Sequence, residues 1–242
     1  MDIGNFSVSY ISHVSFLFQS KSGTTILTDP LFADGFMWNG HLESYLSPPE
    51  ISIDSIKNCD AIFITHIHGD HCDHEAIKRI NDNTGAKIYA PDDVRESLKE
   101  FGVPADSLIH IDDGTEAKVN DVTLLPLAGY DNSADEKGRP NKFSVIISSG
   151  ETSLFYSGDC HSVPPGLKGR NVDAIFIWPH HNDRNILNFH NDVNFKKFVM
   201  MHGDKFKPGE FLCNLDYSEQ KVRLEKLIPG IEIIIPVPIK SL

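Results

Sequence analysis

Four histidines and two aspartates lie within nine residues of this chain, directly after an apolar run. The segment from position 61 to 74 reads AIFITHIHGDHCDH. His66 and His68 stand two residues apart at the end of an expected strand, so their imidazoles share one face, about 7 Å apart. Two imidazoles on one face can bind the same metal ion. A histidine-rich surface loop is the alternative in a chain with 12 histidines.

The residues after His68 extend this pattern to a second ion. Gly69 lets the chain turn sharply. Asp70 and His71 follow in the turn, where neighbouring side chains no longer point in opposite directions. Imidazole and carboxylate together suit zinc, manganese or iron. The order of strand, HxHxDH and helix therefore favours a metal centre over a polar loop.

Strands and helices are expected on both sides of this motif. The unbroken apolar run at 59–65 predicts a buried strand, and 73–82 predicts a helix with Asp73 as its N-cap. A second helix is expected at 91–102, with Pro91 in its first turn and Gly102 past its end. A third is expected at 217–228. The remaining strands are expected at 6–12, 15–20, 24–30, 86–90, 107–111, 116–119, 122–128, 142–150, 152–159, 172–178, 196–204 and 231–239.

Two stretches lack a clear period. Residues 31–49 are rich in aromatic residues, glycine and proline and are expected to form a loop, and residues 182–194 are mixed in character. No repeat and no linker-like change of composition divides the chain. Two blocks of strands with helices between them predict a single α/β domain over 1–242, in which helices flank packed sheets.

Composition narrows the class of protein. The net charge is −12, from 34 acidic and 22 basic residues, which argues against a dedicated nucleic-acid surface. The first 20 residues alternate in polarity like a strand and not like a secretion signal. No apolar run is long enough for a membrane span. The chain has four cysteines without paired spacing, so the cytoplasm is the expected compartment. A small-molecule substrate is expected, and the oligomeric state stays open.

Further segments give the chain a family resemblance. ISHVSFLF with His13, ILTDPLF with Asp29, THIHGDH, FYSGDC with Asp159 and VMMHGDKF with His202 follow one another in the order found in the metallo-β-lactamase superfamily. The chain resembles the lactonase and phosphodiesterase branch of that superfamily, which includes ascorbate-6-phosphate lactonase. The resemblance implies an α/β fold, a four-layer αββα sandwich with the metal centre along one edge.

The resemblance also implies a ligand set for two divalent ions, with zinc as the first expectation and manganese or iron as alternatives. The first site would use His66, His68 and Asp159, and the second would use Asp70, His71, Asp159 and His202. Asp29 would brace a ligating histidine. His13 would lie near the centre and contact substrate.

One departure from the family pattern concerns the first site. The superfamily usually has another histidine between the hallmark motif and the bridging aspartate, but residues 122–147 contain none. Gly129 or Asp131 occupies the expected neighbourhood. Either Asp131 is a carboxylate ligand, or the first site holds only its other ligands with water. The occupancy of both sites is therefore open.

The leading hypothesis is metal-assisted hydrolysis of a phosphoester, lactone or other ester-type small molecule. Metal-bound water becomes acidic enough to supply hydroxide near neutral pH, and Asp70 or Asp159 would orient it. The segment WPHHNDRN follows an apolar strand, so His180, His181 and Arg184 are candidate substrate contacts.

Two other classes remain. If Asp131 is a ligand, the harder and more anionic site would favour iron, and the chain would be a diiron oxygenase. The lack of a second domain for electron delivery in this sequence weighs against that class. A non-catalytic binding module is the third alternative.

Overall fold

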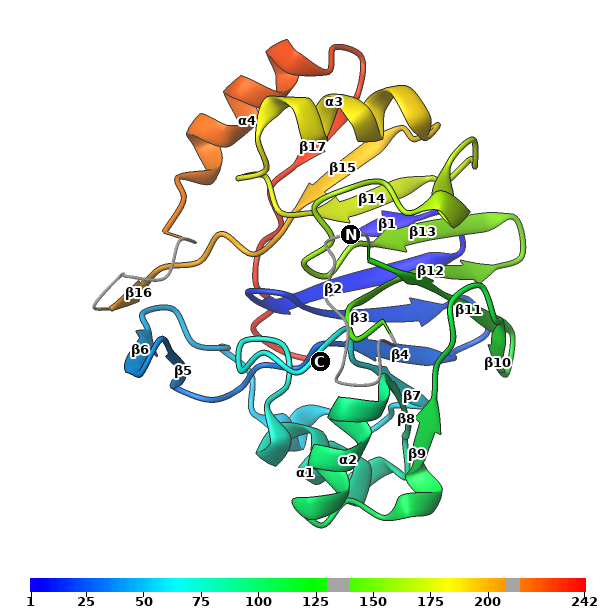
Figure 1. The fold of residues 1–242 in the computed structure, drawn as a ribbon, viewed down its shortest axis with the longest axis vertical. Helices are drawn as coiled ribbons and strands as arrows, with labels where there is room; N and C mark the ends of the chain where they lie inside the picture. The colour runs from blue at the N-terminus through cyan, green and yellow to red at the C-terminus, as the bar shows by residue number, and fades with distance from the viewer. Residues whose placement is uncertain (130–139, 208–213) are drawn as a thin grey trace.

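Two seven-stranded β-sheets form the centre of the molecule (Figure 1). The computed structural model describes residues 1–129, 140–207 and 214–242. The first sheet has the spatial order β1 (Asp2–Ile3), β2 (Phe6–Ser12), β3 (Ser15–Ser20), β4 (Thr25–Thr28), β7 (Ala61–Phe63), β8 (Lys87–Ala90) and β9 (Leu108–His110). The second has the order β10 (Ala117–Val119), β11 (Val122–Ala128), β12 (Phe143–Ser149), β13 (Thr152–Tyr156), β14 (Ala174–Ile177), β15 (Lys197–Met200) and β17 (Glu232–Ile234).

Helices cover the outer face of each sheet. Apolar residues of α1 (His74–Thr84) and α2 (Asp92–Glu100) pack on the first sheet, and those of α3 (Asp183–Asp192) and α4 (Tyr217–Leu227) pack on the second. Figure 1 places these two helix pairs at opposite ends of the view. Short 3₁₀ turns lie at η1 (Ile53–Ser55), η2 (Ala105–Ser107) and η3 (Pro165–Leu167). The order helix, sheet, sheet, helix confirms the predicted αββα sandwich.

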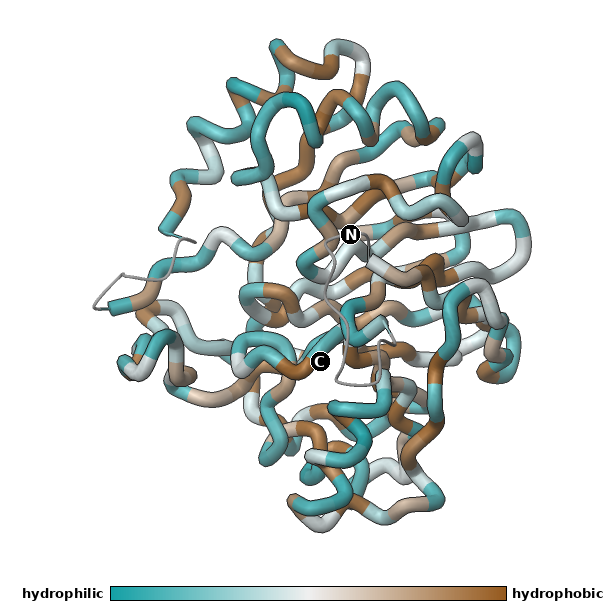
Figure 2. Tube along the Cα trace, viewed as in Figure 1, coloured by the Kyte–Doolittle hydropathy of each residue, from teal (hydrophilic) through white to brown (hydrophobic). Residues whose placement is uncertain are grey.

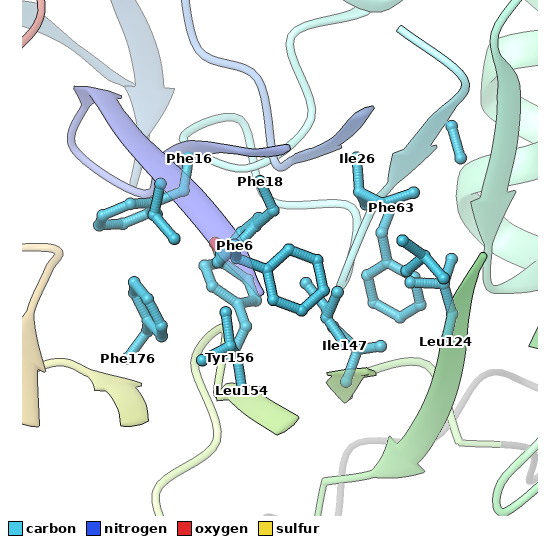
Figure 3. Close-up of a cluster of buried hydrophobic side chains, with 14 of the residues drawn as sticks. Phe6, Phe16, Phe18, Ile26, Phe63, Leu124, Ile147, Leu154, Tyr156 and Phe176 are labelled. Carbon is cyan, nitrogen blue, oxygen red and sulfur yellow. The ribbon is translucent and has the colours of Figure 1, made fainter. Parts of the chain in front are cut away.

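Side chains that alternate along the strands produce the layers. In β13, Leu154 and Tyr156 face the other sheet, whereas Phe155 between them faces the helices. Because successive residues of a strand point to opposite faces, one strand supplies two cores. Figure 3 shows the aromatic cluster between the sheets, where Phe16 and Phe176 meet edge to face at 5.1 Å between ring centroids. Figure 2 shows hydrophobic residues along these strands and hydrophilic residues at many outer turns and helix positions.

The helix after the motif begins and ends as its sequence predicts. Asp73 is the N-cap of α1, and its side chain accepts a hydrogen bond from the backbone N of Ala76. Gly85 ends the helix in the left-handed region at φ 73°. The second helix was predicted to begin one residue too early, because Pro91 is the N-cap of α2 and the helix begins at Asp92.

Both stretches without a clear period contain regular structure. Residues 31–49, expected to form a loop, contain the hairpin β5 (Gly35–Trp38) and β6 (His41–Tyr45), and β16 (Phe206–Lys207) extends it to a small third sheet. The turn residues Asn39 and Gly40 have φ values of 47° and 82°, as a two-residue hairpin turn requires. Residues 182–194 contain α3, whose N-cap Asn182 accepts from the backbone N of Asn185.

The parallel strands determine where functional loops lie. β4, β7, β8 and β9 run parallel in the first sheet, and β13, β14, β15 and β17 run parallel in the second. Loops that leave the carboxyl ends of such strands meet at one edge and commonly form binding sites. In the described part of the chain, no helix has the length and apolar character needed to cross a membrane.

Candidate metal centre

The residues singled out in the sequence follow the carboxyl ends of these parallel strands. Asp29 follows β4, the HxHxDH motif follows β7, Asp159 follows β13, and His202 follows β15. The first two come from the first sheet and the last two from the second. The centre therefore lies at the edge that both sheets share.

His71 lies at the middle of the cluster. Its Nε2 atom is 3.0 Å from Asp159 Oδ1 and 3.1 Å from His202 Nε2. The same Nε2 is 3.5 Å from Asp70 Oδ2. His71, Asp70 and His202 are all buried. Residues 131 positions apart in sequence are thus brought into direct contact away from solvent.

His66 and His68 both approach Asp159, at different depths. His66 Nε2 is buried and 3.2 Å from Asp159 Oδ2. His68 Nδ1 is 3.7 Å from the same oxygen, and the His68 side chain is 37% exposed. The ligand atoms of His66, His71 and Asp159 all lie within 4.8 Å of one another, and that group does not include His68. The structure therefore groups His71 with His66, whereas the sequence analysis assigned them to different ions.

A second group of three lies beside the first. His202 Nε2 is 3.1 Å from Asp70 Oδ2, and His13 Nε2 is 3.4 Å from the same oxygen. The ligand atoms of these three residues also lie within 4.8 Å of one another. His13, expected to contact substrate, is completely buried within this group.

Asp29 contacts His71 at Nδ1, the ring nitrogen that faces away from the cluster. Asp29 Oδ2 is 2.8 Å from His71 Nδ1 and accepts hydrogen bonds from the Thr65 hydroxyl at 2.7 Å and the Tyr156 hydroxyl at 2.8 Å. Its Oδ1 accepts from the backbone N of Thr65 at 2.8 Å. A carboxylate at Nδ1 keeps a proton on that nitrogen, so that Nε2 is the atom of His71 that can bind a metal ion in the cluster.

Unusual backbone conformations are concentrated at this site. His13, Asp29 and His202 have φ values of 46°, 36° and 62°. Non-glycine residues seldom adopt positive φ, and each such residue costs on the order of 1–3 kcal/mol. Because these three belong to separate loops and meet at one place, the strain supports a functional role for that place.

Gly158, the residue before Asp159, lets the two sheets approach. Its φ is 53°, and a Cβ atom there would lie 2.8 Å from Thr65 Cγ2. A side chain at position 158 would therefore push Asp159 away from the histidines of the first sheet.

The charges of the site suit a cation. Burial and the neighbouring His71 lower the pKa of His66 to about 4. Burial opposes a charge on His71, but the surrounding carboxylates, first Asp159, raise the pKa of His71 to about 10. Burial would also raise the pKa values of Asp70 and Asp159, but His71 and nearby imidazoles hold them well below the ordinary range. Anionic carboxylates beside a neutral imidazole are a metal-binding combination.

The unpartnered atoms of the site test whether metal ions fit. Asp70 Oδ1, His66 Nε2 and Asp159 Oδ1 are buried and form no well-aligned hydrogen bond with the described residues, although Asp159 Oδ1 lies 3.0 Å from His71 Nε2 and His66 Nε2 lies 3.2 Å from Asp159 Oδ2. Buried polar atoms without partners are costly, and metal ions at this point would satisfy them. The donor set of imidazole nitrogens and carboxylate oxygens fits divalent ions of the zinc type. Asp131, the proposed substitute ligand, lies outside the described residues.

The three other predicted substrate contacts differ in position. His181 is buried, and burial together with His161 lowers the pKa of His181 to about 3. The exposed His180 packs its ring 5.3 Å from Trp178. Arg184 is exposed in the first turn of α3, and the described contacts do not link it to the cluster.

Two residues near the site, His161 and Trp178, were not singled out in the sequence, whereas Trp38 belongs to the aromatic stretch 31–49. His161 Nδ1 is 3.2 Å from His181 Nδ1, and its position two residues after Asp159 was an available signal. The Trp178 ring lies 4.9 Å from that of His202. From the β5–β6 hairpin, the Trp38 ring approaches that of the partly buried His68, with 6.0 Å between ring centroids.

Comparison with known families and sequences relates this chain to the beta-lactamase superfamily and to a metal-dependent hydrolase. The profile of the family described as beta-lactamase superfamily domain matches residues 24–202. The chain is 27% identical over 125 residues to an uncharacterized protein of Mycobacterium tuberculosis, a match that covers 51% of this chain and 33% of that protein. It is 28% identical over 153 residues to a metal-dependent hydrolase of Hyperthermus butylicus, covering 63% of this chain and 60% of that protein. The chain thus spans about a third of the mycobacterial relative's length.

Solved structures match over nearly the whole chain. A metallo hydrolase from Ignicoccus hospitalis has a TM-score of 0.67 and 20% identity, covering 96% of this chain and 95% of that one. CmlA, a diiron β-hydroxylase from Streptomyces venezuelae, has a TM-score of 0.63 and 16% identity, covering 97% of this chain and 53% of that one. At these identities the likeness supports the fold alone.

Proposed function

Because the chain belongs to the beta-lactamase superfamily domain family, we propose that it is a metal-dependent hydrolase with a dinuclear centre, most simply of zinc. The observation that carries the proposal is the meeting of His66, His71 and Asp159 with Asp70 and His202 around unpartnered buried oxygen and nitrogen atoms. The metal-dependent hydrolase of Hyperthermus butylicus supports the same class.

The side chains have separate tasks in this reaction. When bound, the ions acidify water to a pKa near 7 and stabilise negative charge that develops on a substrate oxygen. Asp70 and Asp159 accept hydrogen bonds from the attacking water and orient it. Asp29 fixes the tautomer of His71. His66 is buried, so bulk water does not reach the side of the metal centre that faces the protein interior.

The substrate we propose is a small phosphoester, lactone or other ester. The exposed side of the centre is bordered by His68, with Trp38 close to its ring. His181 is the best placed of the predicted substrate contacts, and His180 and Arg184 remain proposals for the outer part. A net charge of −12 disfavours a polymeric anion as substrate.

The cysteines support the proposed cytoplasmic location. Cys59 and Cys72 are buried free thiols, and burial raises the pKa of the Cys59 thiol to about 12. Free thiols are usual where the compartment is reducing.

Elemental analysis combined with a substrate screen tests the proposal. Protein purified without added metal is expected to contain about two equivalents of zinc and to hydrolyse members of a phosphodiester and lactone panel. The double substitution H66A/H68A should reduce turnover at least about 100-fold, since loss of an outer partner alone costs 10–100-fold. Circular dichroism verifies that the variant folds. Full activity in the folded double variant would contradict the mechanism.

A diiron oxygenase is the second candidate, because the usual histidine is absent from residues 122–147 and the diiron enzyme CmlA shares the fold. In this case Asp131 would be a ligand. Stoichiometric iron with a visible absorption band, and no hydrolysis in the screen, would favour this candidate over the hydrolase.

A further inference from the structure

His13 occupies an unexpected place for a residue of a surface turn. It lies between β2 and β3, yet its side chain is completely buried and its φ is 46°. Its carbonyl oxygen accepts a hydrogen bond from the backbone N of His202 at 3.0 Å, and the two imidazole centroids are 4.4 Å apart. The strained turn therefore places the His13 imidazole next to that of His202 in the candidate metal centre.

The surroundings of His13 repeat those of His71. Behind His71, Asp29 meets Nδ1 and accepts a hydrogen bond from a tyrosine hydroxyl at 2.8 Å. Behind His13, Asp204 Oδ2 lies 3.4 Å from Nδ1 and accepts a hydrogen bond from the Tyr10 hydroxyl at 2.8 Å. Each histidine thus has a tyrosine-held carboxylate at Nδ1 and directs Nε2 toward the centre. Such a carboxylate behind an imidazole is the usual support of a metal-bound histidine.

The contact between His13 and Asp70 also favours an ion between them. Nε2 of His13 lies 3.4 Å from Asp70 Oδ2, and the same oxygen lies 3.1 Å from Nε2 of His202. Two imidazole nitrogens and one carboxylate oxygen therefore meet at one point, and a cation bound there would contact all three. An imidazole bound to a cation through Nε2 carries its proton on Nδ1, the nitrogen that faces Asp204.

We propose that His13 is a metal ligand, held in place by Asp204 and Tyr10, and that it completes a three-residue site with Asp70 and His202. The inference rests on the proposed function only in requiring that the centre binds metal. It gives each of two ions three protein ligands even though the usual family histidine is missing. His13 is then part of the centre itself instead of a substrate contact.

Metal stoichiometry tests the proposal without reference to activity. Wild type, H13A, H66A and D204N are dialysed against buffered zinc, and bound zinc is measured by elemental analysis. H13A should fall from about two equivalents to about one. D204N should keep two sites but bind one of them about 10–100-fold more weakly, because His13 loses its carboxylate support. Replacement of His190, a histidine on α3 away from the centre, is the matched control and should retain both equivalents.

Cobalt provides a second readout. In the Co²⁺-loaded protein, H13A should lose part of the visible d–d absorption, whereas the His190 variant should keep the wild-type spectrum. If H13A does not fold, the zinc affinities of D204N and Tyr10→Phe test the proposal, because each of these substitutions preserves side-chain volume. Wild-type stoichiometry, affinity and spectrum in H13A, or unchanged affinity in D204N, would overturn the proposal. A wild-type protein that binds no metal, or an H66A variant that loses none, would instead overturn the proposed function.

Discussion

His71 Nε2 lies 3.0 Å from Asp159 Oδ1, although His71 follows a strand of the first sheet and Asp159 follows a strand of the second. The contact therefore exists only when the two sheets are packed. Because a metal ion bound here would link the sheets, metal binding and stability should be coupled in this chain.

Replacement of Asp29 by asparagine should weaken metal binding and destabilise the fold. The carboxylate receives two hydrogen bonds from Thr65 and one from Tyr156 and faces His71 at 2.8 Å. An amide nitrogen would oppose these donors, so we expect zinc affinity to fall about 10–100-fold. We expect the metal-free protein to lose about 3 kcal/mol of unfolding free energy, measured in urea.

The matched control for this change is Asp60→Asn. Asp60 also accepts a hydrogen bond from a backbone N, that of Thr25, at 2.8 Å, but lies outside the metal cluster. Its variant should keep wild-type zinc affinity. An Asp29→Asn protein with undiminished zinc affinity would show that the contact with His71 does not support the ligand.

The sequence predicts the ligands that lie within one short segment better than the ligands contributed by distant segments. The spacing of His66, His68 and His71 after a buried strand is a local pattern, and the structure groups His66 with His71 while His68 lies at their exposed side. Asp159 and His202 were recognised through the family resemblance, because a single aspartate after glycine or a single histidine after a strand has ordinary explanations. Which ligands share one metal ion depends on how the two sheets pack together, and no local spacing in the sequence determines this.

The missed elements have specific causes. Asn39-Gly40 is a strong hairpin signal, but aromatic residues on both sides obscured the strand period. In α3 only Ile186 and Phe189 are buried, so its amphipathic pattern is short. The burial of His13 follows from its contact with His202, which is 189 positions later and cannot be read from the turn itself.

Replacement of Gly158 by alanine should cost more stability than its backbone conformation alone explains. At Gly230 the φ is also positive, at 86°, but a Cβ atom there meets nothing within 4 Å. Gly230→Ala therefore measures the conformational cost, about 1 kcal/mol. Gly158→Ala adds the clash with Thr65, and we expect a total loss of about 3 kcal/mol in urea unfolding. Equal losses in the two variants would contradict the close approach of the sheets.

The metal-free protein should be most stable near pH 6.5. Unfolded histidine has a pKa of about 6.5. The pKa of His66 is lowered to about 4, so the stability from its neutral form is lost as pH falls from 6.5 towards 4. The pKa of His71 is raised to about 10, so the stability from its charged form is present below 6.5 and lost as pH rises towards 10.

Urea midpoints measured across this range check the prediction. His71→Ala should remove the alkaline decrease, because the charged group that is lost between pH 6.5 and 10 is then absent. A midpoint that rises steadily from pH 5 to 9 would contradict the assigned charge states.

Replacement of Arg223 by alanine should impair substrate binding while leaving the metal sites intact. From α4, its guanidinium donates to the carbonyl oxygens of Pro179 at 2.7 Å and His181 at 2.8 Å and pairs with Asp183 at 2.6 Å. These bonds fix the loop that presents His181 beside the centre. We expect KM to rise about tenfold, equivalent to about 1.4 kcal/mol, with zinc content unchanged. The exposed Lys226 of the same helix is the control, and its alanine variant should keep the wild-type KM. A decrease in zinc content, or an unchanged KM in the Arg223 variant, would show that this loop does not position substrate.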